Sequence, residues 1–329
     1  MKQRVACARG RARAGLGSSE RPDQRSARRG WAFALGAAWL LVARWAESGA
    51  PPNTVVVLAP SREREPYAAA IRGFQRALDG KGWTISVRAP VAQASLVGET
   101  PRWIVALGSE ALALARAESP SVPRAFAFAE DERCELVPSE HETGVVLRID
   151  AERIVRTLVE ASPKVATVGY LRRAGEPSCV ARELAGALAR HSLTAMEAAV
   201  GDVREALHAL REQRSKVDAW VLIPEPSIMT RETIDYAILA GLEERDPVMG
   251  FNRATAAGGA LLALSLDPEA LGAQLGALIA RADERRAQAL LPAPELPQAL
   301  GLTINLKTAR ALGLAIPPSL EARASESIR

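Results

Sequence analysis

The side chains best suited to chemistry are few and scattered along the chain. The three histidines, His141, His191 and His208, form no HxxxH or HExxH pattern, and no GxSxG, GxxxxGK[ST] or GxGxxG motif occurs. Nucleophilic catalysis needs a base beside the nucleophile, and a zinc site needs ligands at fixed spacings. The sequence therefore predicts a protein that is not an enzyme and that carries no metal and no cofactor.

Two pairs of acidic residues stand close together in the sequence. They are Glu63 with Glu65 and Glu130 with Asp131, and both pairs fall in polar, loop-like stretches. Such pairs are common on solvated surfaces. We interpret them as surface loops rather than as an acid and base couple.

The chain has three cysteines, Cys7, Cys134 and Cys179. An even pair in an exported protein can form a disulfide, so a bridge between Cys134 and Cys179 is one alternative. Both residues flank charged, loop-like stretches. Two unpaired thiols are the preferred interpretation.

The basic charge is concentrated at the N-terminus. Residues 1–30 hold nine basic and two acidic residues, a net charge of +7, so the other 299 residues carry −3 of the total of +4. The pI near 9.2 therefore describes the N-terminal segment and not the body of the chain. Without a basic stripe on the body, we expect no nucleic-acid partner.

An uncharged apolar run, residues 31–43, follows the basic segment directly. Thirteen residues are fewer than the roughly 20 that span a membrane, but an apolar core of that length after a basic stretch is typical of a secretory signal. Small residues near position 50 provide a cleavage region, although Pro51 is a poor context, and an uncleaved anchor is the alternative. We expect a periplasmic or other extracytoplasmic protein, with residues 1–50 as its targeting segment.

From residue 53 onward, short apolar runs alternate with helical stretches. Residues 54–59 and 102–107 predict buried parallel strands, and residues 67–78 predict an amphipathic helix. The same alternation restarts near residue 150. Strands that alternate with helices favour parallel sheets covered on both faces.

The sequence thus predicts an α/β fold with two Rossmann-like lobes, each with a parallel sheet, joined by a hinge. The first lobe comprises residues 51–145 and is completed by 260–287. The second comprises residues 146–259 and is completed by 288–329. Two parallel sheets whose carboxyl edges face each other form a ligand-binding cleft.

Particular residues resemble a known family. Residues 258–265 read GGALLALS, Leu271-Gly272 follow, and residues 302–317 read LTINLKTARALGLAIP. In these motifs the chain resembles the ABC-transporter substrate-binding proteins of the tryptophan/tyrosine type. The resemblance implies a type I periplasmic binding fold with a three-strand hinge, a small polar, amino-acid-like ligand, and a possible ABC permease in the inner membrane as partner.

The resemblance also implies which loops bind the ligand. Backbone N–H groups at Gly108 and Ser109, with the Ser109 hydroxyl, would hold a carboxylate, and Glu225 would pair with an ammonium group. The candidate residues are Ser61, Arg62, Gly108, Ser109, Glu130, Arg172, Glu225, Phe251 and Asn252.

The cleft loops depart from the family's pattern. The loop after the first strand is charged, Arg172-Arg173 replaces the usual tyrosine–asparagine pair, and Glu225-Pro226 replaces a polar pair. Only 10 of the 14 aromatic residues lie outside the targeting segment, which favours a ligand held by loop charges and backbone amides. An importer component is the main hypothesis. The alternative is a two-lobed envelope interaction or sensor module that has lost transport-linked ligand binding.

Overall fold

A computed structural model describes residues 53–91, 101–129, 135–175, 178–285 and 289–329. The targeting segment that the sequence predicts lies outside these residues. Within them, no helix combines the length and the apolar character needed to cross a membrane.

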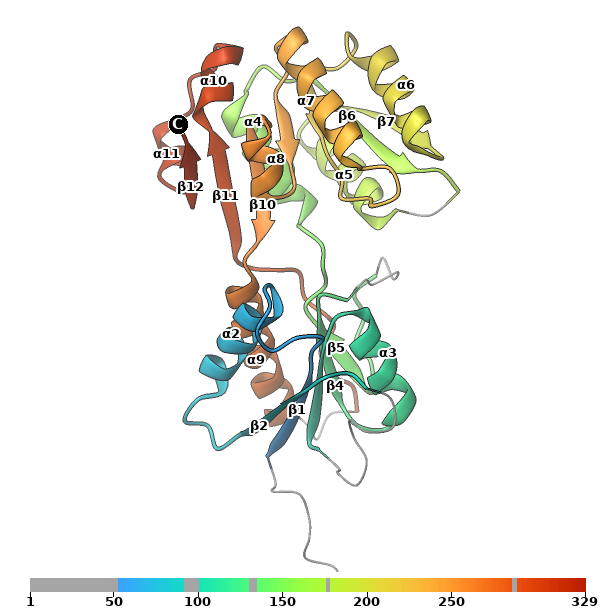
Figure 1. The fold of residues 1–329 in the computed structure, drawn as a ribbon, viewed down its shortest axis with the longest axis vertical. Helices are drawn as coiled ribbons and strands as arrows, with labels where there is room; N and C mark the ends of the chain where they lie inside the picture. The colour runs from blue at the N-terminus through green and yellow to red at the C-terminus, as the bar shows by residue number, and fades with distance from the viewer. Residues whose placement is uncertain (1–52, 92–100, 130–134, 176–177, 286–288) are drawn as a thin grey trace, which may run out of the picture. The chain divides into compact units, whose positions relative to one another are not determined.

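The first lobe contains a five-stranded sheet in the order β2-β1-β3-β4-β5, with every neighbouring pair parallel (Figure 1). The central strands β1 and β3 are buried along their whole length and apolar except for Thr54, as expected for a parallel sheet covered on both faces. The strands are β1 (Thr54–Leu58), β2 (Thr84–Arg88), β3 (Trp103–Leu107), β4 (Arg124–Ala127) and β5 (Glu142–Gly144).

Helices α2 (Tyr67–Leu78) and α9 (Pro268–Glu284) lie side by side in the first lobe, although about 190 positions separate them in sequence (Figure 1). Glycines allow this close approach, because a Cβ at Gly272 would lie 1.9 Å from the carbonyl oxygen of Ala70. Leu271, Leu275 and Ile279 of α9 join the apolar cluster that packs against β1 and β3. The remaining helix is α3 (Ser109–Glu118).

The second lobe contains a seven-stranded sheet in the order β12-β11-β10-β9-β8-β6-β7. All neighbouring pairs are parallel except β10 with β11. The strands are β6 (Thr167–Arg173), β7 (Thr194–Val200), β8 (Ala219–Val221), β9 (Val248–Gly250), β10 (Leu262–Leu266), β11 (Leu300–Asn305) and β12 (Glu326–Ile328).

Helices cover both faces of this sheet. One apolar cluster includes side chains of α4 and α5, and another includes those of α6 and α7. The helices are α4 (Ala151–Ala161), α5 (Cys179–Arg190), α6 (Val203–Gln213), α7 (Arg231–Glu244), α8 (Arg253–Ala257), α10 (Leu306–Leu312) and α11 (Pro318–Glu321). The predicted fold class, α/β with two mostly parallel sheets, is confirmed.

The structure differs from the sequence-based expectations in three details. Residues 142–144 form strand β5 and residues 326–328 form strand β12, and the alternation of apolar runs and helical stretches indicates neither. Strand β10 falls within the range 260–287 that was assigned to the first lobe, but it is hydrogen-bonded to β9 and β11 of the second sheet.

Cys179, the first residue of α5, is disulfide-bonded, and its partner lies outside the described residues. The expectation of an unpaired thiol at this position was therefore wrong. The charged, loop-like stretch before Cys179 favoured a free thiol, but Cys179 lines a pocket at the start of α5.

Candidate ligand-binding site

A cavity of about 970 Å³ lies at the carboxyl ends of four strands in the second sheet. Arg173 ends β6, the segment 222–226 follows β8, Phe251 and Asn252 follow β9, and Leu264 to Leu266 end β10. Ligands of open parallel sheets bind at this edge because the loops that follow the strands are free to vary. Pro66 and Phe128 also line the cavity.

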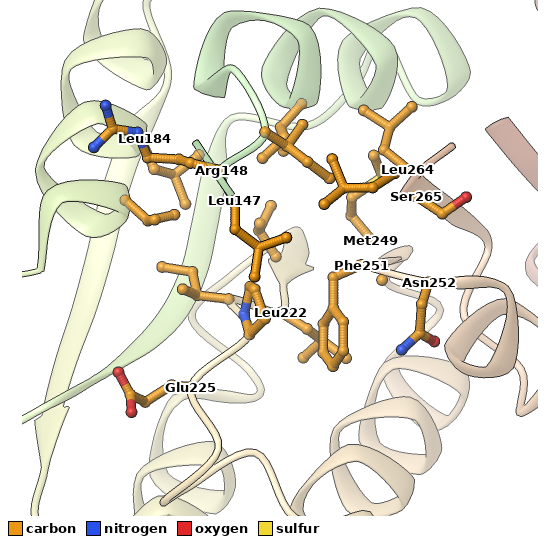
Figure 2. Close-up of a pocket in the computed structure, with 18 of the residues that line it drawn as sticks. Leu147, Arg148, Leu184, Leu222, Glu225, Met249, Phe251, Asn252, Leu264 and Ser265 are labelled. Carbon is orange, nitrogen blue, oxygen red and sulfur yellow. The ribbon is translucent and has the colours of Figure 1, made fainter. Parts of the chain in front are cut away.

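Most of the cavity wall is apolar. Val221, Ile223, Met249 and Leu264 are at most 5% exposed and belong to the same apolar cluster as Leu184 of α5. Figure 2 shows Leu147, Leu222 and Phe251 between the charged groups on one side of the view and Asn252 and Ser265 on the other. The cavity is thus continuous with the core of the second lobe, and an apolar group bound there gains hydrophobic stabilisation.

Asn252 is placed by helix α8. It is the N-cap of that helix, where its side-chain oxygen accepts a hydrogen bond from the Thr255 N–H at 2.9 Å. Gly250 must precede it without a side chain, because a Cβ there would lie 2.0 Å from Thr255 Oγ1. With the Asn252 oxygen engaged in the cap, its amide nitrogen is the group that remains to donate to a ligand.

Glu225 is placed by the turn that follows β8. Its backbone carbonyl accepts hydrogen bonds from the N–H groups of Ile228 and Met229, at 3.1 and 2.7 Å. One carboxylate oxygen accepts a hydrogen bond from Ser227 Oγ at 3.2 Å. The second carboxylate oxygen is therefore available to accept a hydrogen bond from a cation in the cavity.

Arg148 also lines the cavity, and the sequence analysis did not select it. Arg148 is only 8% exposed, and its Nε has no hydrogen-bond partner among the residues that the structure describes. Arg148 Nη2 forms an ion pair with Glu183 Oε1 of α5 at 3.4 Å. A signal was present in the sequence, since Arg148 is a single charge within the apolar run from Val145 to Ile149.

The sequence model of the family described as ABC transporter substrate binding protein matches residues 85–328. The chain belongs to this family. Its members are binding proteins and not enzymes, and they take small-molecule ligands outside the cytoplasm. A search of curated proteins gives no significant match.

Solved structures of other substrate-binding proteins share the fold. A substrate binding protein with adhesive properties from Clostridium difficile, in a ligand-free, open structure, has a TM-score of 0.65 at 16% identity, over 84% of this chain and 99% of that one. The ABC domain from Streptococcus pneumonia in complex with L-Trp has a TM-score of 0.57 at 19% identity, over 85% of this chain and 100% of that one. This substrate-binding protein therefore has a type I periplasmic binding fold.

Three of the nine candidate residues, Glu225, Phe251 and Asn252, line the cavity. Arg172 does not, because β6 extends to Arg173 and successive side chains of a strand point to opposite faces. Arg172 Nε donates to Glu197 Oε1 of β7 at 2.5 Å, whereas Arg173 lines the cavity.

Four candidates lie at the carboxyl ends of β1 and β3 in the first lobe and are not among the cavity-lining residues: Ser61, Arg62, Gly108 and Ser109. Ser61 Oγ accepts hydrogen bonds from the N–H groups of Glu63 and Arg64, which fixes the turn after β1. Gly108 has φ +103° and is the N-cap of α3, a conformation that favours glycine. Glu130 lies outside the described residues.

Metal ligands do not gather anywhere in the described part of the chain. No group of three or more His, Cys, Asp or Glu side chains there is arranged to hold an ion. The charged and amide side chains that line the cavity are those of Arg148, Arg173, Glu225 and Asn252.

Proposed function

We propose that this substrate-binding protein is the extracytoplasmic solute receptor of an ABC importer, and that it binds a small, amino-acid-like ligand in the cavity at the edge of the second sheet. The observation that carries the proposal is the cavity itself. It has the size of a small-molecule site, an apolar wall and a few polar groups around it.

The charged groups support a ligand of this kind. Arg148 and Arg173 carry positive charge at the cavity, and Glu225 carries negative charge. A zwitterion with an apolar side chain would meet a partner for each of its ends and an apolar surface between them. The similar fold of the Streptococcus pneumonia domain that was solved with L-Trp adds support for an amino-acid-like ligand.

The N-terminal segment supports the location. A basic stretch and a 13-residue apolar run are typical of an export signal, and a receptor at the outer face of the membrane would deliver its ligand to a permease there. Cell fractionation of a C-terminally tagged chain, with protease added to intact spheroplasts, tests the location. Digestion of the tag in intact spheroplasts, or its release with the periplasmic fraction, supports the proposal, and protection of the tag contradicts it.

Ligand binding is tested with the purified full-length protein. A library of amino acids, nucleosides and small organic anions is screened by thermal shift, and each hit is titrated by calorimetry. A ligand at 100 times its Kd stabilises the native state by about 2.7 kcal/mol. Saturable binding of an amino acid supports the whole proposal, whereas saturable binding of another class supports the receptor role and contradicts the amino-acid-like ligand. If nothing in the library binds and no small molecule is released on denaturation, the receptor role fails and the alternative of an envelope interaction module takes its place.

A further inference from the structure

Arg148 is a buried cation whose hydrogen-bonding capacity is largely unused. A guanidinium has five N–H donors. Among the described residues, Nε has no hydrogen-bond partner, and Nη2 has the 3.4 Å ion pair with Glu183. A buried donor without a partner reduces stability, and a buried charge needs both a counter-charge and hydrogen bonds to be well compensated. The guanidinium of Arg148 would therefore be stabilised by further hydrogen bonds to an anionic acceptor.

Helix α5 adds positive potential to the same end of the cavity. Ser178, Cys179 and Val180, the start of this 12-residue helix, all line the cavity. Ser178 Oγ caps one N–H, that of Ala181, at 3.2 Å. The N–H groups of the first turn have no acceptor within the helix, and the helix dipole favours an anion beside them. Figure 2 shows the Arg148 side chain directed toward this helix.

The charge around this end of the cavity suits an anion of low charge. Arg148 lines it, and Glu183 of α5 offsets part of the Arg148 charge. Glu225 lies at the turn after β8 and is held by Ser227. A monoanion therefore matches the local charge better than a dianion such as phosphate would.

The rest of the cavity favours an apolar ligand body. Leu147, Leu222, Met249, Phe251 and Leu264 surround the rest of the cavity. A hydrophilic ligand such as a sugar would leave its hydroxyl groups without partners against this wall. The occupant must combine one anionic group with an apolar body.

We infer that the cavity binds an organic carboxylate with an apolar body, that its carboxylate lies against Arg148 and the start of α5, and that Arg148 selects for the carboxylate. This inference rests on the proposed receptor function and specifies the ligand chemistry of the same site. It makes Arg148 a specificity-determining residue.

The test compares ligands that differ only in the charge of one group. The probes are 4-methylpentanoate and 3-phenylpropanoate, each with its neutral amide, titrated into the full-length protein by calorimetry at pH 7. Charge-assisted hydrogen bonds to a buried cation are strong, so we expect each carboxylate to bind at least about tenfold more tightly than its amide. Equal affinities for acid and amide overturn the inference.

Variants then assign the preference to Arg148. Arg148→Gln removes the charge and should abolish the preference for the acid, whereas Arg148→Lys keeps the charge and should retain part of it. Arg190→Gln is the control for a general loss of positive charge, because Arg190 is the last residue of α5, at the end away from the cavity-lining Ser178 and Cys179, and its side chain is 64% exposed. Thermal melting of each variant establishes that it is folded before titration. A preference that survives in Arg148→Gln overturns the inference.

The library screen separates this inference from the receptor function. If the screen finds a ligand without a carboxylate, the receptor function stands and the carboxylate inference fails. If the screen finds no ligand at all, the receptor function fails first. If the screen finds a carboxylate larger than the probes, that ligand and its amide are compared in the same variants.

Discussion

Arg102, which precedes β3, and Asp283, in the last turn of α9, are joined by two hydrogen bonds of 2.6 and 2.8 Å across 181 positions of sequence. The Trp103 indole N–H donates to the same carboxylate at 3.2 Å. Because the Asp283 side chain is only 15% exposed, these bonds are shielded from water and hold α9 on the first sheet.

Replacing Asp283 should therefore destabilise the first lobe. Asp283→Ala leaves Arg102 and the Trp103 N–H without this acceptor, and we expect a loss of about 2–3 kcal/mol. Urea denaturation measures it. Asp235→Ala is the control, because Asp235 forms an exposed ion pair with Arg231 and should cost under about 0.5 kcal/mol. Similar losses in the two variants would contradict the role of Asp283.

The contact between α2 and α9 should tolerate no added side chain. In Gly272→Ala the new Cβ would lie 1.9 Å from the Ala70 carbonyl oxygen, so the helices must move apart at a cost of about 1–3 kcal/mol. Gly186→Ala on α5 is the matched control, since only Arg190 Nη1, at 3.5 Å, is near its Cβ. There the better helix propensity of alanine should stabilise by about 0.5–1 kcal/mol. Thermal melts in which both variants change Tm in the same direction would contradict the close packing.

Glu142 should make stability depend on pH in the acidic range. Burial raises the pKa of Glu142, but hydrogen bonds and charge from Arg116 and then Arg124 outweigh it and leave the pKa below the ordinary 4.5. The stabilisation is therefore present above pH 4.5 and lost as pH falls through the lowered value. Glu142→Gln should cost about 2 kcal/mol near pH 7 and progressively less below pH 4.5. Denaturation curves from pH 3 to 7 measure it, and a difference that does not vary with pH would reject this assignment.

Asp246 should act in the opposite direction. Burial, then the charges of Asp218 and Glu244, raise the pKa of Asp246 from 3.8 to about 6. When the pKa of an acid is higher in the native state than in the unfolded state, the acid stabilises the fold at pH values below the unfolded-state pKa. For Asp246 this contribution to stability is lost as pH rises through about 6. Asp246→Asn should therefore stabilise the protein at pH 7–8, by on the order of 1 kcal/mol after allowance for solvent screening, and have little effect below pH 3.8. Tm measured against pH decides it; a destabilised variant at pH 8 would count against the raised pKa.

Glu225 should distinguish ligands that carry an ammonium group. If the receptor binds an amino acid, Glu225→Gln should weaken its binding by about tenfold or more, because the ammonium loses its counter-charge. Binding of the same molecule without its amino group should hardly change. Glu232→Gln, in the exposed first turn of α7, is the control for a general loss of negative charge. Equal weakening for both ligands would remove Glu225 from the role of ammonium partner.

Buried apolar strands were the part of the fold that the sequence predicted well. Residues 55–58 and 103–107 are apolar throughout, and runs of this kind form central strands of parallel sheets. β5 and β12 were missed because Glu142–Gly144 and Glu326–Ile328 are three residues long and partly polar. These two strands are stabilised by pairing with β4 and β11, and the sequence of a short segment does not indicate such pairing.

The candidate site was harder to predict because burial decides which charges matter. Arg172 and Arg173 look equivalent in sequence, yet strand alternation places the first against Glu197 and the second in the cavity. Arg148 gave a weaker signal than either, since one arginine in an apolar run reads as a strand or loop charge. Its significance comes from packing among elements that are distant in sequence, which a single chain does not reveal.

The position of α9 in the chain has a consequence for synthesis. The apolar cluster of β1 and β3, which includes Val55, Val57 and Trp103, is completed by side chains of a helix that ends at Glu284. While the chain is being made, about 120 residues, including most of the second lobe, emerge between the last strand of the first sheet, β5, and helix α9. A nascent first lobe therefore exposes an uncovered apolar face until synthesis is nearly finished. The order of the elements along the chain therefore makes the first lobe fold late, after most of the second lobe has been synthesised.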